Sequence, residues 1–167
     1  MGKNAPKKNL VEIGSPVFAN SFKTHMMEGN DKGSRHSGLH AANELIRDNS
    51  NYTMDVIERD SRNREIYTAD VRLQGNDNSK RSTFFPNDMN YDAVKAKVIE
   101  AWRDSRTYTR DDTIYKDLAA KYGLSWVGMA QIGTQKIWIG STKSGAQGQG
   151  LETAFPAVNN KFLKGGG

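Results

Sequence analysis

The stretch YTMDVIERDSRNREIYTADVRL, residues 52–73, carries the clearest fold signal in this chain. Apolar residues alternate with polar ones from Tyr52 to Arg59 and again from Ile66 to Leu73, on either side of the polar linker DSRNRE. A period of two is typical of strands that bury one face, and a short polar linker joins neighbouring antiparallel strands. The stretch therefore predicts a β-hairpin.

The residues that follow predict a further strand and a long helix. In KRSTFFP, residues 80–86, Phe84 and Phe85 are expected to enter the core, and the proline ends the strand. The pattern from Tyr91 to Ser105 is helical, with Asn90 as its N-cap. Its apolar residues recur at helical spacing and form one stripe for the core, namely Val94, Val98, Ala101 and Trp102.

The remaining segments complete the fold prediction. A second helix is expected over residues 112–122, with Ile114, Leu118 and Ala119 on its apolar side and Gly123 at its end. Strands are expected at residues 124–132, 136–141 and 150–155, and short helices at residues 17–27 and 40–48. The pattern predicts an α+β fold in which N-terminal helices are followed by antiparallel sheets.

Length and composition limit the class of protein. The 167 residues suit a flexible basic arm (residues 1–16), a single domain (17–160) and a flexible tail (161–167). The net charge of +5 favours polyanions such as RNA as partners. The absence of cysteine excludes thiol nucleophiles, disulfides and cysteine-ligated zinc. No apolar run approaches the roughly 20 residues of a membrane-spanning helix.

The stretch HMMEGNDKGSRHSGLH, residues 25–40, holds all three histidines of the chain among several glycines. Histidine exchanges a proton near neutral pH, so this cluster indicates acid–base chemistry or metal binding. Two histidines of opposite protonation state can cleave RNA, with a lysine stabilising the charge that develops on the phosphate. A hydroxyl group and an aromatic ring can hold the base. The chain offers candidates for each role, namely His25, His40, Lys80 or Arg81, Thr153 and Phe155.

Four segments in order, HMMEGNDKGSRHSGLHAANEL, KRSTFFP, VGMAQIGTQKIWIG and LETAFP, resemble the EndoU-type endoribonucleases. The closest likeness is to the bacterial branch found as the toxic C-terminal domain of contact-dependent inhibition and other polymorphic toxins. The resemblance runs from about Ser21 to Pro156. It implies a single EndoU-like nuclease domain with a ribonuclease A-like arrangement, and metal-independent RNA cleavage that leaves a 2′,3′-cyclic phosphate.

The same resemblance implies a role for individual residues. His25 corresponds to the first catalytic histidine, His40 to the second, and Lys80 to the catalytic lysine. Thr153 and Phe155 correspond to the hydroxyl and aromatic pair that contacts the base and ribose.

Two assignments stay open at the level of sequence. His36 is either the second catalytic histidine or a surface or phosphate-contacting residue, although Gly38-Leu39-His40 meets the predicted start of a helix and favours His40. Lys80 and Arg81 are adjacent, and the alternation of a strand points only one of them inward. Lysine is the residue type that the family uses, so Lys80 is preferred and Arg81 is a candidate substrate contact.

The resemblance also implies partners and a setting. The substrate would be tRNA or other cytosolic RNA, no cofactor would be needed, and a cognate immunity protein would inhibit the enzyme. The domain would be secreted or delivered from a larger parent protein and act in the cytoplasm of a target cell. Two other readings compete with it: an RNA-binding module without catalysis, and a metal site built from the histidines with Asp31 or Glu28. The spacing of the latter fits no common zinc pattern.

Overall fold

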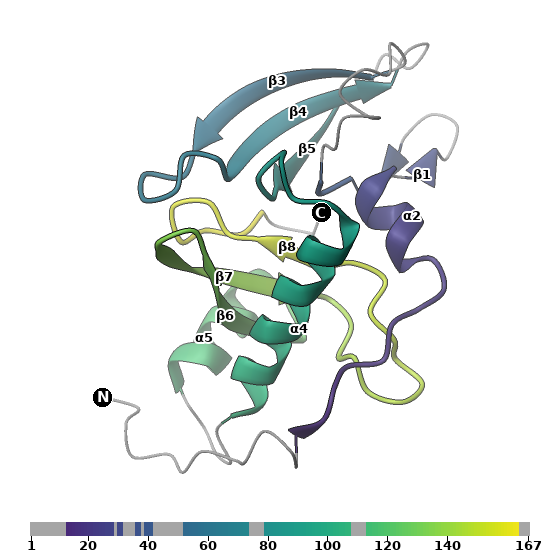
Figure 1. Ribbon diagram of the computed structural model, residues 1–167, viewed down its shortest axis with the longest axis vertical. Coiled ribbons are helices and arrows are strands. Elements are labelled where there is room, and N and C mark those ends of the chain that lie inside the picture. The colour runs from purple at the N-terminus through teal and green to yellow at the C-terminus, as the bar shows by residue number, and fades with distance from the viewer. Residues whose placement is uncertain are drawn as a thin grey trace.

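The computed structural model describes residues 13–28, 30–31, 36–37, 39–41, 52–73, 79–107 and 113–163. Within these residues, helices and two three-stranded antiparallel sheets confirm the α+β class (Figure 1). The elements in chain order are α2 (Phe22–Met27), β1 (Asn30–Asp31), β2 (His36–Ser37), β3 (Tyr52–Arg59), β4 (Tyr67–Leu73), β5 (Ser79–Phe84), α4 (Tyr91–Arg106), α5 (Thr113–Tyr122), β6 (Trp126–Ile132), β7 (Gln135–Ser141) and β8 (Phe155–Pro156). In the sequence α4 and α5 stand between the two sheets, so the helices do not all precede the strands.

The first sheet has the order β3-β4-β5, and its hairpin confirms the prediction from residues 52–73. Tyr52 lies opposite Leu73, and a bulge interrupts β3 between Val56 and Glu58. One face of the sheet packs against Leu39 in a buried cluster that also contains Tyr67, Ala69, Val71 and Phe84.

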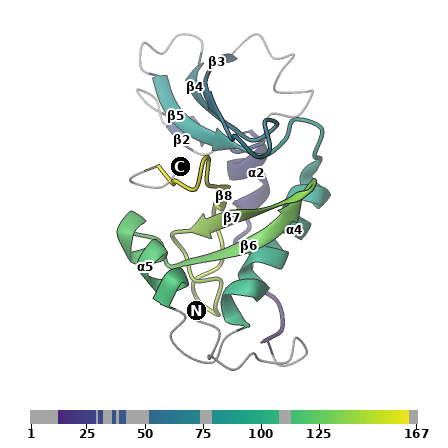
Figure 2. The same cartoon turned by 90° about the vertical axis from the view of Figure 1, so that its left-hand side faces the viewer.

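The second sheet has the order β6-β7-β8, and β8 faces the first sheet (Figure 2). The turn between β6 and β7 contains Gly133, whose φ of +65° is readily adopted only by glycine. Strand β8 also contacts β5. The two sheets therefore meet where β8 approaches β5.

Helix α4 confirms its predicted cap and core stripe. The Asn90 side chain accepts a hydrogen bond from the backbone N–H of Ala93 at 2.9 Å, which satisfies one of the free donors of the first turn. The predicted stripe of Val94, Val98, Ala101 and Trp102 is buried. The helix approaches β6 so closely that a Cβ atom on Gly128 would lie 1.9 Å from the carbonyl oxygen of Ala101.

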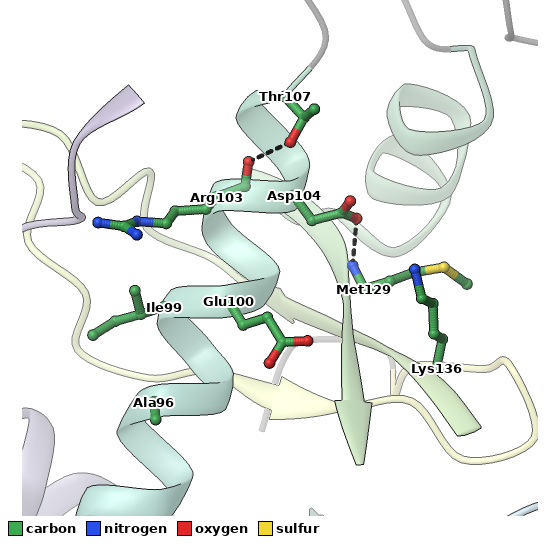
Figure 3. Close-up of a pocket in the computed structure, with 8 residues that line it drawn as sticks. All are labelled: Ala96, Ile99, Glu100, Arg103, Asp104, Thr107, Met129 and Lys136. Atoms are coloured by element: carbon green, nitrogen blue, oxygen red, sulfur yellow. Dashed lines mark hydrogen bonds between the residues drawn. The ribbon is translucent and has the colours of Figure 1, made fainter. Parts of the chain in front are cut away.

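Helix α4 also covers the outer edge of β6. The Asp104 carboxylate accepts a hydrogen bond from the backbone N–H of Met129 at 2.8 Å (Figure 3). Glu100 accepts one from the backbone N–H of Gln131 at 2.6 Å. These carboxylates occupy donors that an edge strand would otherwise offer to another chain.

Several local predictions were wrong. Helix α2 begins at Phe22, not at residue 17, because Phe18 instead forms a parallel bridge with Leu151. Gly150 lies so close to this segment that a Cβ on it would be 2.9 Å from the backbone nitrogen of Ala19. This long-range contact takes the place of the predicted strand at residues 150–155, of which only Phe155 belongs to a strand, β8. Ile114 of α5 is 55% exposed and does not face the core.

Other predictions fall partly outside the described residues. Ala41 forms a parallel bridge with Phe85, so no helix begins at His40, and residues 42–48 lie outside the described part of the chain. Two residues of the predicted arm are bound by helix α4. Arg103 of this helix donates hydrogen bonds to the carbonyl oxygen of Gly14 at 2.8 Å and to the hydroxyl of Ser15 at 3.1 Å. Residues 1–12 and 164–167 are not described. No helix in the described ranges is both long and apolar enough to cross a membrane.

Candidate active site

Backbone hydrogen bonds bring the segment around His40 against helix α2. The N–H of Leu39 donates to the carbonyl oxygen of His25 at 2.7 Å, and the N–H of His40 donates to that of Met26 at 2.8 Å. The ring centroids of His25 and His40 consequently lie 6.2 Å apart. The Nε2 atoms of both rings are buried.

Leu39 holds an unusual backbone conformation beside this pair. Its φ is +68°, in the left-handed region that a leucine rarely adopts, and its side chain is buried in the first sheet's cluster. A conformation of this kind costs of order 1–3 kcal/mol and persists where the surroundings enforce it, often at active sites.

The His40 ring is oriented by β5. Its Nδ1 lies 2.9 Å from the carbonyl oxygen of Thr83 and 3.0 Å from the hydroxyl of Ser82, which itself donates to the carbonyl oxygen of Leu39 at 2.9 Å. A carbonyl oxygen only accepts, so we assign a proton to Nδ1. In the neutral ring, Nε2 is then the basic nitrogen. Ser82 and Thr83 were not singled out from the sequence, where they differ little from other residues of a strand.

The alternation of β5 separates Lys80 from Arg81. Ser82 points toward His40, so Lys80, two residues earlier, lies on the same face of the strand and Arg81 on the other. The Arg81 guanidinium forms a bidentate ion pair with Asp70 across the sheet, at 2.9 and 3.2 Å. The hydrogen bond to Asp70, together with its negative charge, raises the pKa of Arg81.

The second sheet contributes the C-terminal candidates. Phe155 is fully buried, and its ring centroid lies 5.3 Å from that of His40. The hydroxyl of Thr153 is buried and makes no hydrogen bond within the described part of the chain. An unsatisfied buried hydroxyl costs free energy in the absence of a ligand. Residues from both sheets therefore come together around His40.

His36 is placed only by its backbone. It belongs to β2, where its Cα partner in β1 is Asp31. Among the residues that the structure describes, no group of three or more His, Cys, Asp or Glu side chains is arranged to hold a metal ion.

A cavity of about 400 Å³ lies elsewhere in the molecule (Figure 3). It is bounded by α4, β6 and β7, and none of the residues predicted for the site lines it. Its lining residues are Ala96, Ile99, Glu100, Arg103, Asp104, Thr107, Met129 and Lys136.

Comparison with known protein families decides the assignment of the chain. The model of the bacterial EndoU nuclease family matches residues 20–158. The chain belongs to this family. As a bacterial EndoU nuclease it is an endoribonuclease, and its substrate class is RNA. Neither the comparison with curated proteins nor the comparison with solved structures finds a match.

Proposed function

We propose that this EndoU nuclease cleaves RNA without a metal ion, by transesterification at the 2′-hydroxyl. One histidine removes the proton of the 2′-hydroxyl, and the 2′-oxygen attacks the adjacent phosphorus. The second histidine gives a proton to the departing 5′-oxygen. The products are a 2′,3′-cyclic phosphate and a free 5′-hydroxyl, and the two histidines finish in exchanged protonation states.

The observation that carries this proposal is the pairing of His25 and His40, whose ring centroids lie 6.2 Å apart. At this separation both rings can reach oxygens of one phosphodiester group. The contact of His40 Nδ1 with the Thr83 carbonyl supports a role for Nε2 in proton transfer, since Nδ1 is engaged by the protein. Because both Nε2 atoms are buried, substrate binding has to displace the groups that cover them.

Lys80 is proposed to stabilise the negative charge that develops on the phosphate, since it shares the strand face of Ser82 and His40. Thr153 is proposed to bind the base or ribose through its buried hydroxyl. Phe155 is proposed as its aromatic partner, and in the present arrangement its ring packs on His40. Arg81 and His36 are proposed to contact phosphates away from the scissile bond.

The biological role follows from the toxin branch that the sequence resembles. We propose that the domain is delivered from a larger parent protein into the cytoplasm of a target cell, where it cleaves tRNA or other cytosolic RNA. An immunity protein would protect the producing cell. An acidic inhibitor surface that covers His25, His40 and Lys80 would complement the chain's net charge of +5.

The test is incubation of the purified protein with total tRNA in excess chelator, with mapping of the product ends. The wild type is expected to leave 2′,3′-cyclic phosphates, and His40→Ala to lower the rate by about 10²–10⁴-fold, the usual contribution of a general acid or base. His36→Ala is the matched control and should retain its cleavage rate at saturating RNA. Inhibition by the chelator, or full activity of His40→Ala, would contradict the mechanism. Binding of tRNA without cleavage by the wild type would favour the RNA-binding module.

A further inference from the structure

Two lysines from different helices converge on one aromatic ring, that of Tyr91. The ammonium of Lys23 in α2 lies 5.1 Å from the ring centroid of Tyr91, at the start of α4. The ammonium of Lys95 lies 5.9 Å from the same centroid and 4.7 Å from that of Phe18. Such distances are those of cation–π contacts, which hold an ammonium over a ring without neutralising it.

These lysines keep their positive charge available. In the described part of the chain, neither Lys23 nor Lys95 forms an ion pair with a carboxylate, whereas Lys97 is paired with Glu100. Burial of the ring and then the charge of Asp92 raise the pKa of Tyr91. The Tyr91 hydroxyl therefore stays neutral at neutral pH.

The cluster is built on a rigid base. Phe22 is buried in the core, and its ring centroid lies 4.7 Å from that of Phe18 and 6.3 Å from that of Tyr91. The rings of Phe18 and Tyr91 are themselves only half-buried and so present surface to solvent. A rigid, partly exposed ring flanked by ammonium groups is the arrangement that binds single-stranded RNA, by stacking of bases and contacts to phosphates.

The cluster also lies close to the candidate active site. Lys23 and His25 belong to the same short helix, two residues apart and therefore on roughly opposite sides of it. A helix with its side chains is about 10–12 Å across, so an RNA strand that leaves His25 crosses this distance within a few nucleotides.

We propose that Lys23, Lys95 and Tyr91 form an RNA-docking site, a few nucleotides from the scissile bond, that binds the backbone phosphates and stacks one base. This inference rests on the proposed cleavage at His25 and His40 for its position relative to the cut. The docking site raises the affinity for long RNA and leaves the chemistry of the cleavage step unchanged.

The experiment compares Lys23→Gln/Lys95→Gln with wild type on a single-stranded RNA of about 20 nucleotides, long enough to reach from the cleavage site to the docking site, and on dinucleotides, which fill only the cleavage site. For the long RNA, KM is expected to rise roughly tenfold, and the dependence of log KM on log salt to weaken by about 1.4, or 0.7 for each lost phosphate contact. The kcat for the long RNA and the kcat/KM for dinucleotides should not change. Lys23→Arg/Lys95→Arg should restore the wild-type KM.

The control is Lys121→Gln/Lys136→Gln, which removes the same charge from α5 and β7. An equal rise in KM in this control would show that the effect depends only on the net charge of the protein, and would overturn the proposal. An unchanged KM in Lys23→Gln/Lys95→Gln would also overturn it. Circular dichroism of each variant checks that the fold is kept. If the wild type cleaves neither substrate, the proposed function fails. The docking site is then tested by fluorescence anisotropy with the same long RNA, which compares the affinity, and its dependence on salt, among the wild type, Lys23→Gln/Lys95→Gln and the control variant.

Discussion

His40 owes its chemical properties to the residues around it. A histidine on a solvated loop has two equivalent choices of tautomer, whereas here the Thr83 carbonyl accepts from one ring nitrogen. The contact of Phe155 on the ring restricts its rotation. The neighbours thus select both the nitrogen available for proton transfer and the direction in which it points.

The adjacent residues Lys80 and Arg81 allow a matched test at the residue scale. Lys80→Ala is expected to lower kcat by about 10²-fold with little change in KM, since it removes a charge that acts mainly on the transition state. Arg81→Ala should keep kcat near its wild-type value and raise KM only modestly, because Arg81 is paired with Asp70 on the other face of β5 and is proposed to contact only phosphates away from the scissile bond. Steady-state kinetics on one RNA substrate measure both. A larger loss of kcat in Arg81→Ala than in Lys80→Ala would reverse the assignment.

At the scale of elements, the contact between α4 and β6 depends on the absence of a side chain at one position. Gly128→Ala would place its Cβ 1.9 Å from the Ala101 carbonyl, so the helix must shift. We expect a loss of about 1–3 kcal/mol in the free energy of unfolding, typical of overpacking. Urea denaturation measures it, with Thr134→Ala in the exposed β6–β7 turn as the control. Equal stability of Gly128→Ala and wild type would mean that the helix adapts without cost.

The elements that the sequence predicted well are those encoded by local patterns. The apolar spacing in α4 predicted its buried stripe, and the alternation on both sides of residues 60–65 predicted the hairpin, and both are present. The alternation did not predict burial in β3, where Val56 and Ile57 are 46% and 45% exposed. Strand β8 and the start of α2 could not be found in this way. Phe18 and Leu151 bridge each other across more than 100 residues, and no local period encodes such a contact.

At the scale of the whole molecule, one buried carboxylate joins the turn of the first sheet to the chain beyond the second. Asp60 accepts hydrogen bonds from the backbone N–H groups of Arg62 and Asn63 within its own turn, both at 3.0 Å. It also accepts one from the N–H of Asn159 at 2.7 Å. These hydrogen bonds to Asp60 help to fix the relative position of the two sheets. The distance from Lys80 to Thr153 therefore depends in part on them.

Asp60→Ala is therefore expected to lower the free energy of unfolding by about 2–4 kcal/mol, because it leaves three partly buried backbone N–H groups without this acceptor. The kcat should fall as well, since the sheets lose a fixed contact. Urea denaturation and kinetics on one sample measure both, with the exposed Asp55→Ala on β3 as the control. Full stability of Asp60→Ala would show that the sheets are held together by other contacts alone.

Sequence patterns could supply the types of residue in the candidate site but not all of their geometry. The order of the four segments indicated which histidine, lysine, threonine and phenylalanine to consider. The orientation of His40 depends on backbone groups of Leu39 and Thr83, and a carbonyl oxygen is present at every residue. Only the register of β5 against the His40 segment shows which carbonyl is used.

The residues of the candidate active site are far apart in the sequence, and this decides when the site is completed during translation. Met26, next to His25, is contacted by the backbone N–H of Ala154 at 3.4 Å, a span of 128 residues. A ribosome that has made the first sheet and both long helices has already translated the two histidines and the lysine, but not the strand that packs on His40. The nascent enzyme is surrounded by RNA while incomplete, and it gains its full active site only once Phe155 has been made and packs on His40.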